Sequence, residues 1–127
     1  MERLFWICLG GAAGTAARYF VSGWALKSLG PAFPYGTLAV NVVGSFLLAA
    51  IMHVGLATDF LSPTLRLALT TGVMGGFTTY STFSYETMKY LQEGAWYLAA
   101  TNVLVTVFAC LAACFLGMAG ARALVGN

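Results

Sequence analysis

Charged side chains are scarce in this sequence. Only six lysine or arginine and four aspartate or glutamate residues occur among its 127 residues, whereas 60% of the residues are hydrophobic. So few charges exclude the solvated surface of an ordinary soluble domain. A formal net charge of +2 gives no reason to expect a nucleic-acid partner. The composition indicates an all-α integral membrane protein surrounded by the lipid bilayer.

Cysteine and histidine are also rare. Cys8, Cys110 and Cys114 lie within apolar stretches, and three is an odd number, so we expect packing side chains rather than disulfides. His53 is the only histidine and has no companion ligand for a zinc site. Its place near the end of the second apolar stretch favours an interfacial side chain over a proton relay.

Long apolar runs, by contrast, are abundant. Four stretches are each long enough to cross a bilayer, which takes about 20 apolar residues. They cover residues 4–26, 36–57, 64–91 and 95–121. We therefore expect a single four-helix transmembrane channel domain over residues 1–127. The first stretch resembles a cleavable signal, but we expect it to be retained because it continues well past Arg18.

The third stretch contains an interruption. Residues 72–84 read Gly-Val-Met-Gly-Gly-Phe-Thr-Thr-Tyr-Ser-Thr-Phe-Ser, with glycines and hydroxyls where a membrane helix is normally apolar. Backbone that leaves its helical hydrogen bonds in hydrocarbon is tolerated only inside protein or beside a wet cavity. The sequence therefore predicts a third helix that is broken at this Gly/Thr-rich segment and that belongs to a pathway or an ion site.

The few cations are divided almost equally between the two sides of the membrane. With four spans, Arg3, Arg66 and Arg122 share one side, and Lys27 and Lys89 lie on the other, which Arg18 of the first span is also expected to reach. A chain without a positive-inside bias is expected to insert in both orientations. We therefore expect an antiparallel, dual-topology homodimer. Tight helix packing is expected as well, because small residues recur at four-residue intervals. These are Gly10 and Gly14, Gly72 and Gly76, and Ala109, Ala113 and Gly117.

Neutral polar residues form stripes on two of the spans. Thr37, Asn41 and Ser45 share one helical face of the second span. Asn102, Thr106, Cys110 and Cys114 share one face of the fourth. Each residue alone is explained by hydrogen bonding between helices, but stripes that converge on a helix break favour a conduction path.

The acidic residues do not interrupt these stripes. Glu2, Asp59, Glu86 and Glu93 fall near predicted helix ends, and Glu86 comes nearest to an exception, so we expect it in a vestibule or a helix-end contact. Neutral donors without strong charge suit an anion that must enter and also leave. The lining therefore indicates a small anion.

Two aromatic residues and one arginine are further candidates for the ion path. Tyr80 and Phe83 are three residues apart, so in a resumed helix their rings share a face. A ring edge carries positive potential and can touch a weakly hydrated anion. Ring packing against neighbouring helices is the simpler alternative. Arg18 lies well inside the first span and either snorkels to the headgroups or pairs with helix carbonyls near a pore mouth.

These motifs resemble those of the CrcB or Fluc family of fluoride channels. The resemblance rests on residues 36–41, Gly-Thr-Leu-Ala-Val-Asn, and on residues 71–87, which contain the interruption, and it extends over essentially the whole chain. It implies a dual-topology dimer in a microbial plasma membrane, with two antiparallel pores through which fluoride leaves the cytoplasm passively. No enzyme activity follows from it.

The resemblance also implies roles for individual residues. The aromatic positions that contact the ion match Tyr80 and Phe83, and the pore asparagine matches Asn41. The hydroxyls after the first aromatic match Ser81 and Thr82. Thr37 and Thr106 are further pore residues that we expect from the stripes themselves, not from the resemblance. A structural sodium ion at the dimer centre, held by backbone carbonyls, matches Gly75 and Thr78.

This chain departs from the family pattern at two places. Tyr80 stands where phenylalanine is usual, and Cys110 and Cys114 stand where the fourth helix commonly offers hydroxyls, which are better donors. Two rival functions remain open. A small multidrug transporter that exchanges protons for cations needs a membrane carboxylate, which the first span lacks. A membrane subunit without transport activity is the other.

Overall fold

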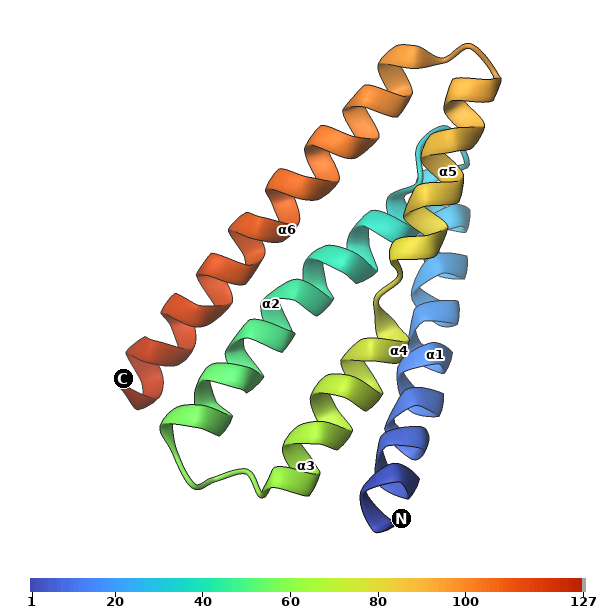
Figure 1. Cartoon of the computed structure of the whole chain (residues 1–127). Coiled ribbons are helices and arrows are strands. Elements are labelled where there is room, and N and C mark those ends of the chain that lie inside the picture. Colours follow the sequence, from blue (N-terminus) through green and yellow to red (C-terminus); the bar gives the residue numbers. More distant parts are fainter. Residues whose placement is uncertain (127) are drawn as a thin grey trace.

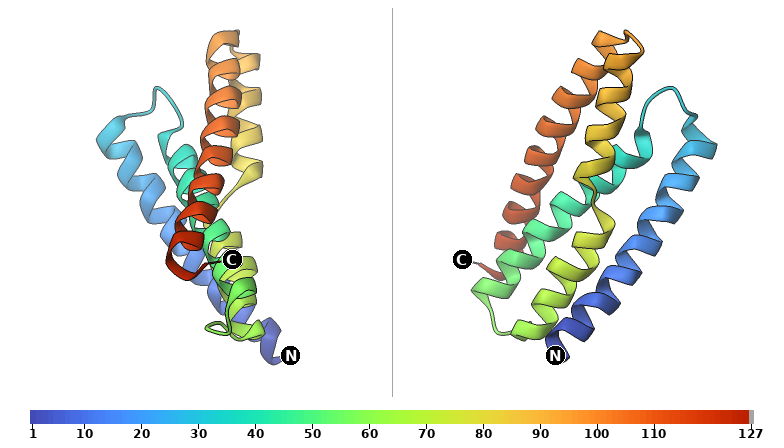
Figure 2. Two further views of the ribbon diagram at one scale, coloured as in Figure 1. Left: turned by 90° about the vertical axis from the view of Figure 1, so that its left-hand side faces the viewer. Right: turned by 45° about the vertical axis from the view of Figure 1, so that its right-hand side comes forward.

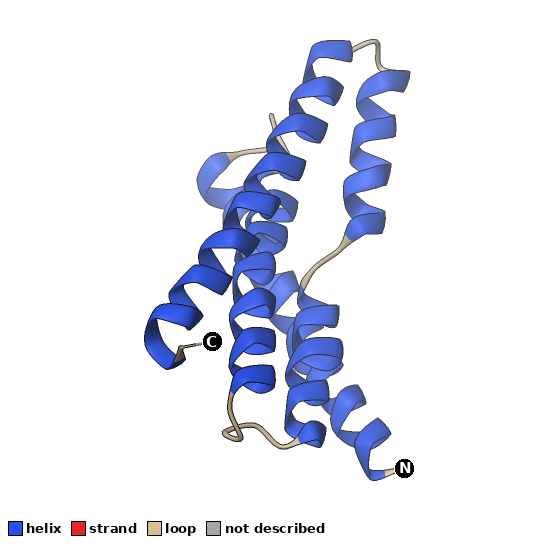
Figure 3. Cartoon of the chain, turned by 60° about the vertical axis from the view of Figure 1, so that its left-hand side comes forward, coloured by secondary structure: helices blue, strands red, loops and turns tan. Residues whose placement is uncertain are grey.

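The computed structural model describes residues 1–126 and is helical throughout, as Figure 3 shows by colour. Its elements are α1 (Glu2–Leu29), α2 (Tyr35–Ala57), α3 (Pro63–Leu67), the π-helical segment η1 (Ala68–Met74), α4 (Gly75–Phe77), α5 (Tyr80–Gln92) and α6 (Trp96–Val125). Among the described residues, α1, α2 and α6 are long and apolar enough to cross a membrane as single helices. The remaining crossing runs from α3 to α5 and is broken, as the sequence predicts.

The crossings alternate in direction. In Figure 1 the N-terminus, the α2–α3 connection and the C-terminal end lie at one end of the molecule, and the other two connections lie at the opposite end. Arg3, Arg66 and Arg122 therefore belong to one end, as the sequence predicts. Figure 2 shows that α1 diverges from α5 and α6 toward the end where α1 and α2 are joined.

Local chemistry explains where several helices begin and end. Gly30 stops α1 with a φ of 81°, a left-handed conformation that suits glycine. At the start of α3, Pro63 occupies the first turn and the Ser62 side chain accepts a hydrogen bond from the Leu65 N–H. Arg66 then reaches back and donates from Nη1 to the Gly55 carbonyl, 3.2 Å away, near the end of α2. The connection between α2 and α3 is thus held by the side chains of Ser62 and Arg66.

Glycine permits the closest helix packing. A Cβ atom on Gly72 would lie 2.7 Å from the Ile7 carbonyl oxygen, and one on Gly76 would lie 2.5 Å from that of Gly11. On α6, a Cβ on Gly117 would collide with the Phe46 carbonyl of α2. The small residues at four-residue intervals therefore mark close packing, as predicted, and they join α1 to the broken segment and α2 to α6.

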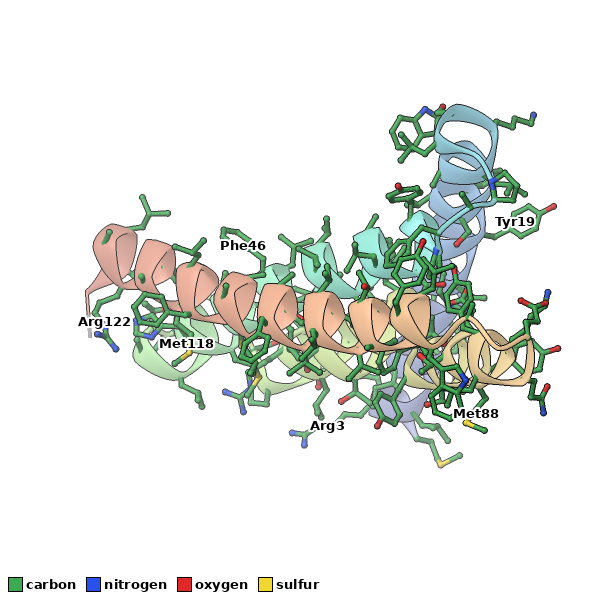
Figure 4. The ribbon with its side chains drawn as sticks, turned by 90° about the horizontal axis from the view of Figure 1, so that it is seen from above. Arg3, Tyr19, Phe46, Met88, Met118 and Arg122 are labelled. Atoms are coloured by element: carbon green, nitrogen blue, oxygen red, sulfur yellow. The ribbon has the colours of Figure 1, made fainter. Side chains whose placement is uncertain are left out.

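Large apolar side chains lie mostly on the outside. Figure 4 shows Tyr19 projecting away from the ribbon, and Tyr19 is 75% exposed. The buried hydrophobic residues are mainly small, with Val40, Met74, Phe77 and Phe83 as the large ones. An apolar exterior around a core of small residues is the arrangement expected of a multi-pass membrane protein.

Candidate ion pathway at the helix break

The helix break consists of two residues in extended conformation. Thr78 has φ −89° and ψ 160°, and Thr79 has φ −152° and ψ 114°. Both are β-branched, which favours extended backbone. Thr79 also starts α5, because its Oγ1 accepts a hydrogen bond of 3.2 Å from the Thr82 N–H. The local sequence therefore both ends α4 and restarts the helix at Tyr80.

Asn41 of α2 satisfies the backbone at this break. Its Oδ1 accepts from the Thr79 N–H at 2.8 Å, and its Nδ2 donates to the Thr79 carbonyl at 3.0 Å. The side-chain amide of Asn41 thus replaces the helical hydrogen-bond partners of both the N–H and the carbonyl of Thr79. Without it, two backbone groups would be orphaned in an apolar environment, which is costly.

The same hydrogen bonds release two backbone carbonyls. In an uninterrupted helix the Thr79 N–H would donate to the Gly75 carbonyl, and the Thr82 N–H to the Thr78 carbonyl. Here those N–H groups donate to Asn41 Oδ1 and Thr79 Oγ1. The carbonyl oxygens of Gly75 and Thr78 therefore lose their intrahelical donors, and Gly75 lies on the exposed surface of the molecule. Such oxygens are suitable ligands for a hard cation.

Arg18 lies beside the break. Its Nε donates to the carbonyl of Gly76 at 2.9 Å, across 58 residues of sequence. Of the two alternatives left open by the sequence, pairing with helix carbonyls is therefore the one observed. The bond satisfies another carbonyl of the interrupted segment and fixes α1 to it.

A cavity of about 450 Å³ lies against the break, between α2, η1, α5 and α6. Its polar lining residues are Asn41, Ser45, Thr70, Thr78, Thr79, Tyr80, Thr106 and Cys110. Within residues 1–126, no charged residue lines this cavity. Part of each stripe therefore reaches the break, namely Asn41 and Ser45 of α2 and Thr106 and Cys110 of α6, around a space with neutral hydrogen-bonding groups.

The two predicted aromatics lie on one wall of this cavity. The rings of Tyr80 and Phe83 have centroids 5.8 Å apart and planes inclined by 43°. Phe83 is 8% exposed, whereas Tyr80 is 80% exposed. Both belong to the first turns of α5, whose N-terminus carries the positive end of the helix dipole. The shared face predicted from their spacing is therefore confirmed, and the Tyr80 ring remains free to contact another molecule.

Ser81 and Thr82 lie at the start of α5 but outside the cavity lining. The Thr79 hydroxyl donates to Thr82 Oγ1 at 2.9 Å, and Ser81 Oγ lies 3.4 Å from Thr79 Oγ1. The three hydroxyls thus form a small cluster at the N-terminus of α5. In residues 1–126 these groups contact one another and the helix start.

Thr37 lies in a second cavity, which has a volume of about 510 Å³ and lies between α1, α2 and α5. Its hydroxyl donates to Glu86 Oε2 at 3.0 Å. The other carboxylate oxygen, Oε1, is buried and has no hydrogen-bond partner within residues 1–126. Lys89 and Glu93 line the same space, so Glu86 lies in a charged vestibule. Thr37 and Asn41 share a helical face, but they open into different cavities.

The polar stripe of α6 is divided in the same way. Thr106 and Cys110 line the cavity at the break, whereas Cys114 lines a separate apolar cavity of about 620 Å³ together with His53. His53 also forms a 2.7 Å hydrogen bond through Nε2 with the Gly126 carbonyl near the chain end. The sequence analysis did not identify Thr87, which accepts a hydrogen bond from Asn102. The one available signal was the position of Asn102 as the first residue of the polar stripe, since a buried amide needs a hydrogen-bond partner.

The chain resembles known proteins over its whole length. The family model described as "CrcB-like protein, Camphor Resistance (CrcB)" matches residues 5–118. The chain is 57% identical over 127 residues to the "Fluoride-specific ion channel FluC" of Sorangium cellulosum (strain So ce56), covering 100% of both chains. It is 54% identical over 126 residues to the protein of that name from Anaeromyxobacter dehalogenans (strain 2CP-1 / ATCC BAA-258), covering 99% of this chain and 100% of the relative. This chain is therefore a member of the CrcB-like protein family.

Proposed function

We propose that this protein is a passive fluoride channel that lets fluoride leave the cytoplasm across the plasma membrane of a microbe. The observation that carries the proposal is the uncharged cavity at the break, with Tyr80 and Phe83 on its wall. Full-length relatives named as fluoride-specific ion channels support the choice of ion. The protein is accordingly a transporter rather than an enzyme.

The geometry suits a small anion that must not be held too tightly. An anion in the cavity meets the positive end of α5 and the rings of Tyr80 and Phe83, and an aromatic ring attracts an anion at its edge. Hydroxyl and thiol groups of Thr106 and Cys110 lie on the facing helix. Because none of these groups carries a full charge, binding is favourable without trapping the ion.

Individual residues take different roles in this proposal. Tyr80, Phe83 and Thr106 face the ion inside the cavity, and Asn41 frames the cavity by holding the break. Ser81 and Thr82 supply hydroxyls at the N-terminus of α5. Thr37 belongs to the vestibule, where its bond to Glu86 places a hydroxyl at one end of the path.

The pore is completed by a second copy of the chain in the opposite orientation. Three features support this dual-topology homodimer. The cations are nearly balanced between the two ends of the fold, Tyr80 is 80% exposed, and Gly75 is exposed beside the break. An exposed polar backbone at membrane depth needs protein rather than lipid against it. Two antiparallel protomers would give two antiparallel pores.

A sodium ion between the two breaks would be held by the carbonyl oxygens of Gly75 and Thr78. The fit rests on the loss of their helical donors to Asn41 and Thr79. Within residues 1–126 no group of three or more acidic, histidine or cysteine side chains competes as a metal site. When bound, the ion supplies positive charge that joins the two carbonyl-rich segments, and its role is structural.

Purified protein in liposomes loaded with potassium fluoride tests this function. We expect an external fluoride electrode to record rapid release once valinomycin balances the charge, without any proton gradient. Fluoride retention would instead favour a subunit without transport activity. Release that requires a proton gradient, or uptake of lipophilic cations, would favour the multidrug-type exchanger.

A further inference from the structure

Asn102 on α6 is the most deeply buried polar side chain among the described residues, with 1% of its surface exposed. It does not line the cavity at the break. Its Nδ2 donates to Thr87 Oγ1 of α5 at 3.0 Å, and its Oδ1 accepts from Thr106 Oγ1 of α6 at 3.4 Å. A buried amide is tolerated only with such partners, so the bond to Thr87 ties α6 to α5.

These bonds continue to the backbone of the pore aromatic. Thr87 receives a hydrogen bond from Asn102 and donates its own proton to the Phe83 carbonyl at 2.9 Å. One chain of hydrogen bonds therefore runs from Thr106 through Asn102 and Thr87 to Phe83. Its two ends line the same cavity, one on α6 and one on α5.

From this connection we propose that Asn102 is a positioning residue, which sets the distance between the Phe83 ring and the Thr106 hydroxyl across the ion path. The inference rests on the proposed channel function. α5 follows an extended break at Thr78 and Thr79, so its direction is not dictated by the helix before it. Asn41 holds the residue just before α5, Thr79, and Asn102 holds α5 about two turns later through Thr87.

The two bonds of Asn102 differ in length. The 3.0 Å bond to Thr87 is of ordinary strength, whereas the 3.4 Å bond from Thr106 is long and weak. The Thr106 proton is thus directed at Asn102 but is released at little cost when an anion enters the cavity. Asn102 thereby fixes α5 firmly and Thr106 loosely, as expected if the hydroxyl must turn toward a passing ion.

Thr87 offers a matched pair of substitutions for the test. Thr87→Ser keeps the hydroxyl, and Thr87→Val removes it at nearly constant volume. In fluoride efflux from liposomes we expect Thr87→Ser to stay within about twofold of the wild type. We expect Thr87→Val to be slowed on the order of tenfold, the effect of one buried hydrogen bond. Adding Asn102→Leu to Thr87→Val should slow efflux little further, because both changes break the same connection.

The outcomes separate the two proposals. Equal efflux by Thr87→Val and Thr87→Ser would overturn the positioning role. So would a double variant whose fold-loss of efflux equals the product of the losses in Thr87→Val and Asn102→Leu alone. Failure of the wild-type protein to release fluoride would overturn the channel function instead. If Asn102→Leu does not fold, the two Thr87 variants decide the question, with gel filtration confirming that both keep the assembly of the wild type.

Discussion

Replacing Asn41 by leucine removes the side chain that satisfies the helix break while keeping a similar volume. The N–H and carbonyl of Thr79 both lose their partners, at 2.8 and 3.0 Å. Each unsatisfied buried group costs about 1–3 kcal/mol, so the free energy of unfolding should fall by about 2–6 kcal/mol. Asn41→Asp, protonated because an ionised carboxylate is costly to bury, keeps an acceptor for the Thr79 N–H and an O–H donor for its carbonyl, and should therefore lose less than Asn41→Leu.

Ser45→Ala provides the matched control for this substitution. Ser45 lies one turn further along α2 and lines the same cavity, but it makes none of the hydrogen bonds at the break. The three variants would be compared by equilibrium unfolding in detergent micelles and by fluoride efflux. We expect stability to fall in the order Ser45→Ala, Asn41→Asp, Asn41→Leu. Equal unfolding midpoints for Asn41→Leu and Ser45→Ala would refute the assignment of Asn41 as the support of the break.

Three further predictions concern the pore and the packing. Phe83→Ile should abolish fluoride efflux while gel filtration still shows the assembly of the wild type, and variant liposomes that empty at the wild-type rate would remove Phe83 from the pore. Tyr80→Phe should conduct at least as fast as the wild type, because it removes a hydroxyl that can retain the ion or water; efflux slowed by tenfold would show that the hydroxyl assists conduction. Gly14→Ala should prevent folding or dimer formation, since its Cβ would collide with the Val73 carbonyl, whereas Gly23→Ala, with open space around its Cβ, should behave as the wild type in the same gel-filtration assay.

The spans and the position of the break were predictable because they depend on local composition. The expected second span, residues 36–57, compares with the observed Tyr35–Ala57. The glycine, threonine and serine content of residues 72–84 identified the interruption, which falls at Thr78 and Thr79. The π-helical turn before it carries no comparable signal, since residues 68–74 also fit an α-helix.

The partners of the polar residues were less predictable because they depend on how distant helices pack. Asn41 was recognised as part of a stripe, but its two bonds to Thr79 span 38 residues of sequence. Thr37 shares that stripe and yet faces Glu86 in another cavity. A helical stripe predicts which residues share a face, but the element opposite each of them is a tertiary property.

Selective fluoride release by the purified chain tests the central claim most directly. Liposomes loaded with equal concentrations of fluoride and chloride would be followed with two ion-selective electrodes after addition of valinomycin. The account predicts that fluoride leaves rapidly from protein-containing vesicles while chloride stays inside. Release of both anions together, or of neither, would contradict a fluoride-selective path at the break.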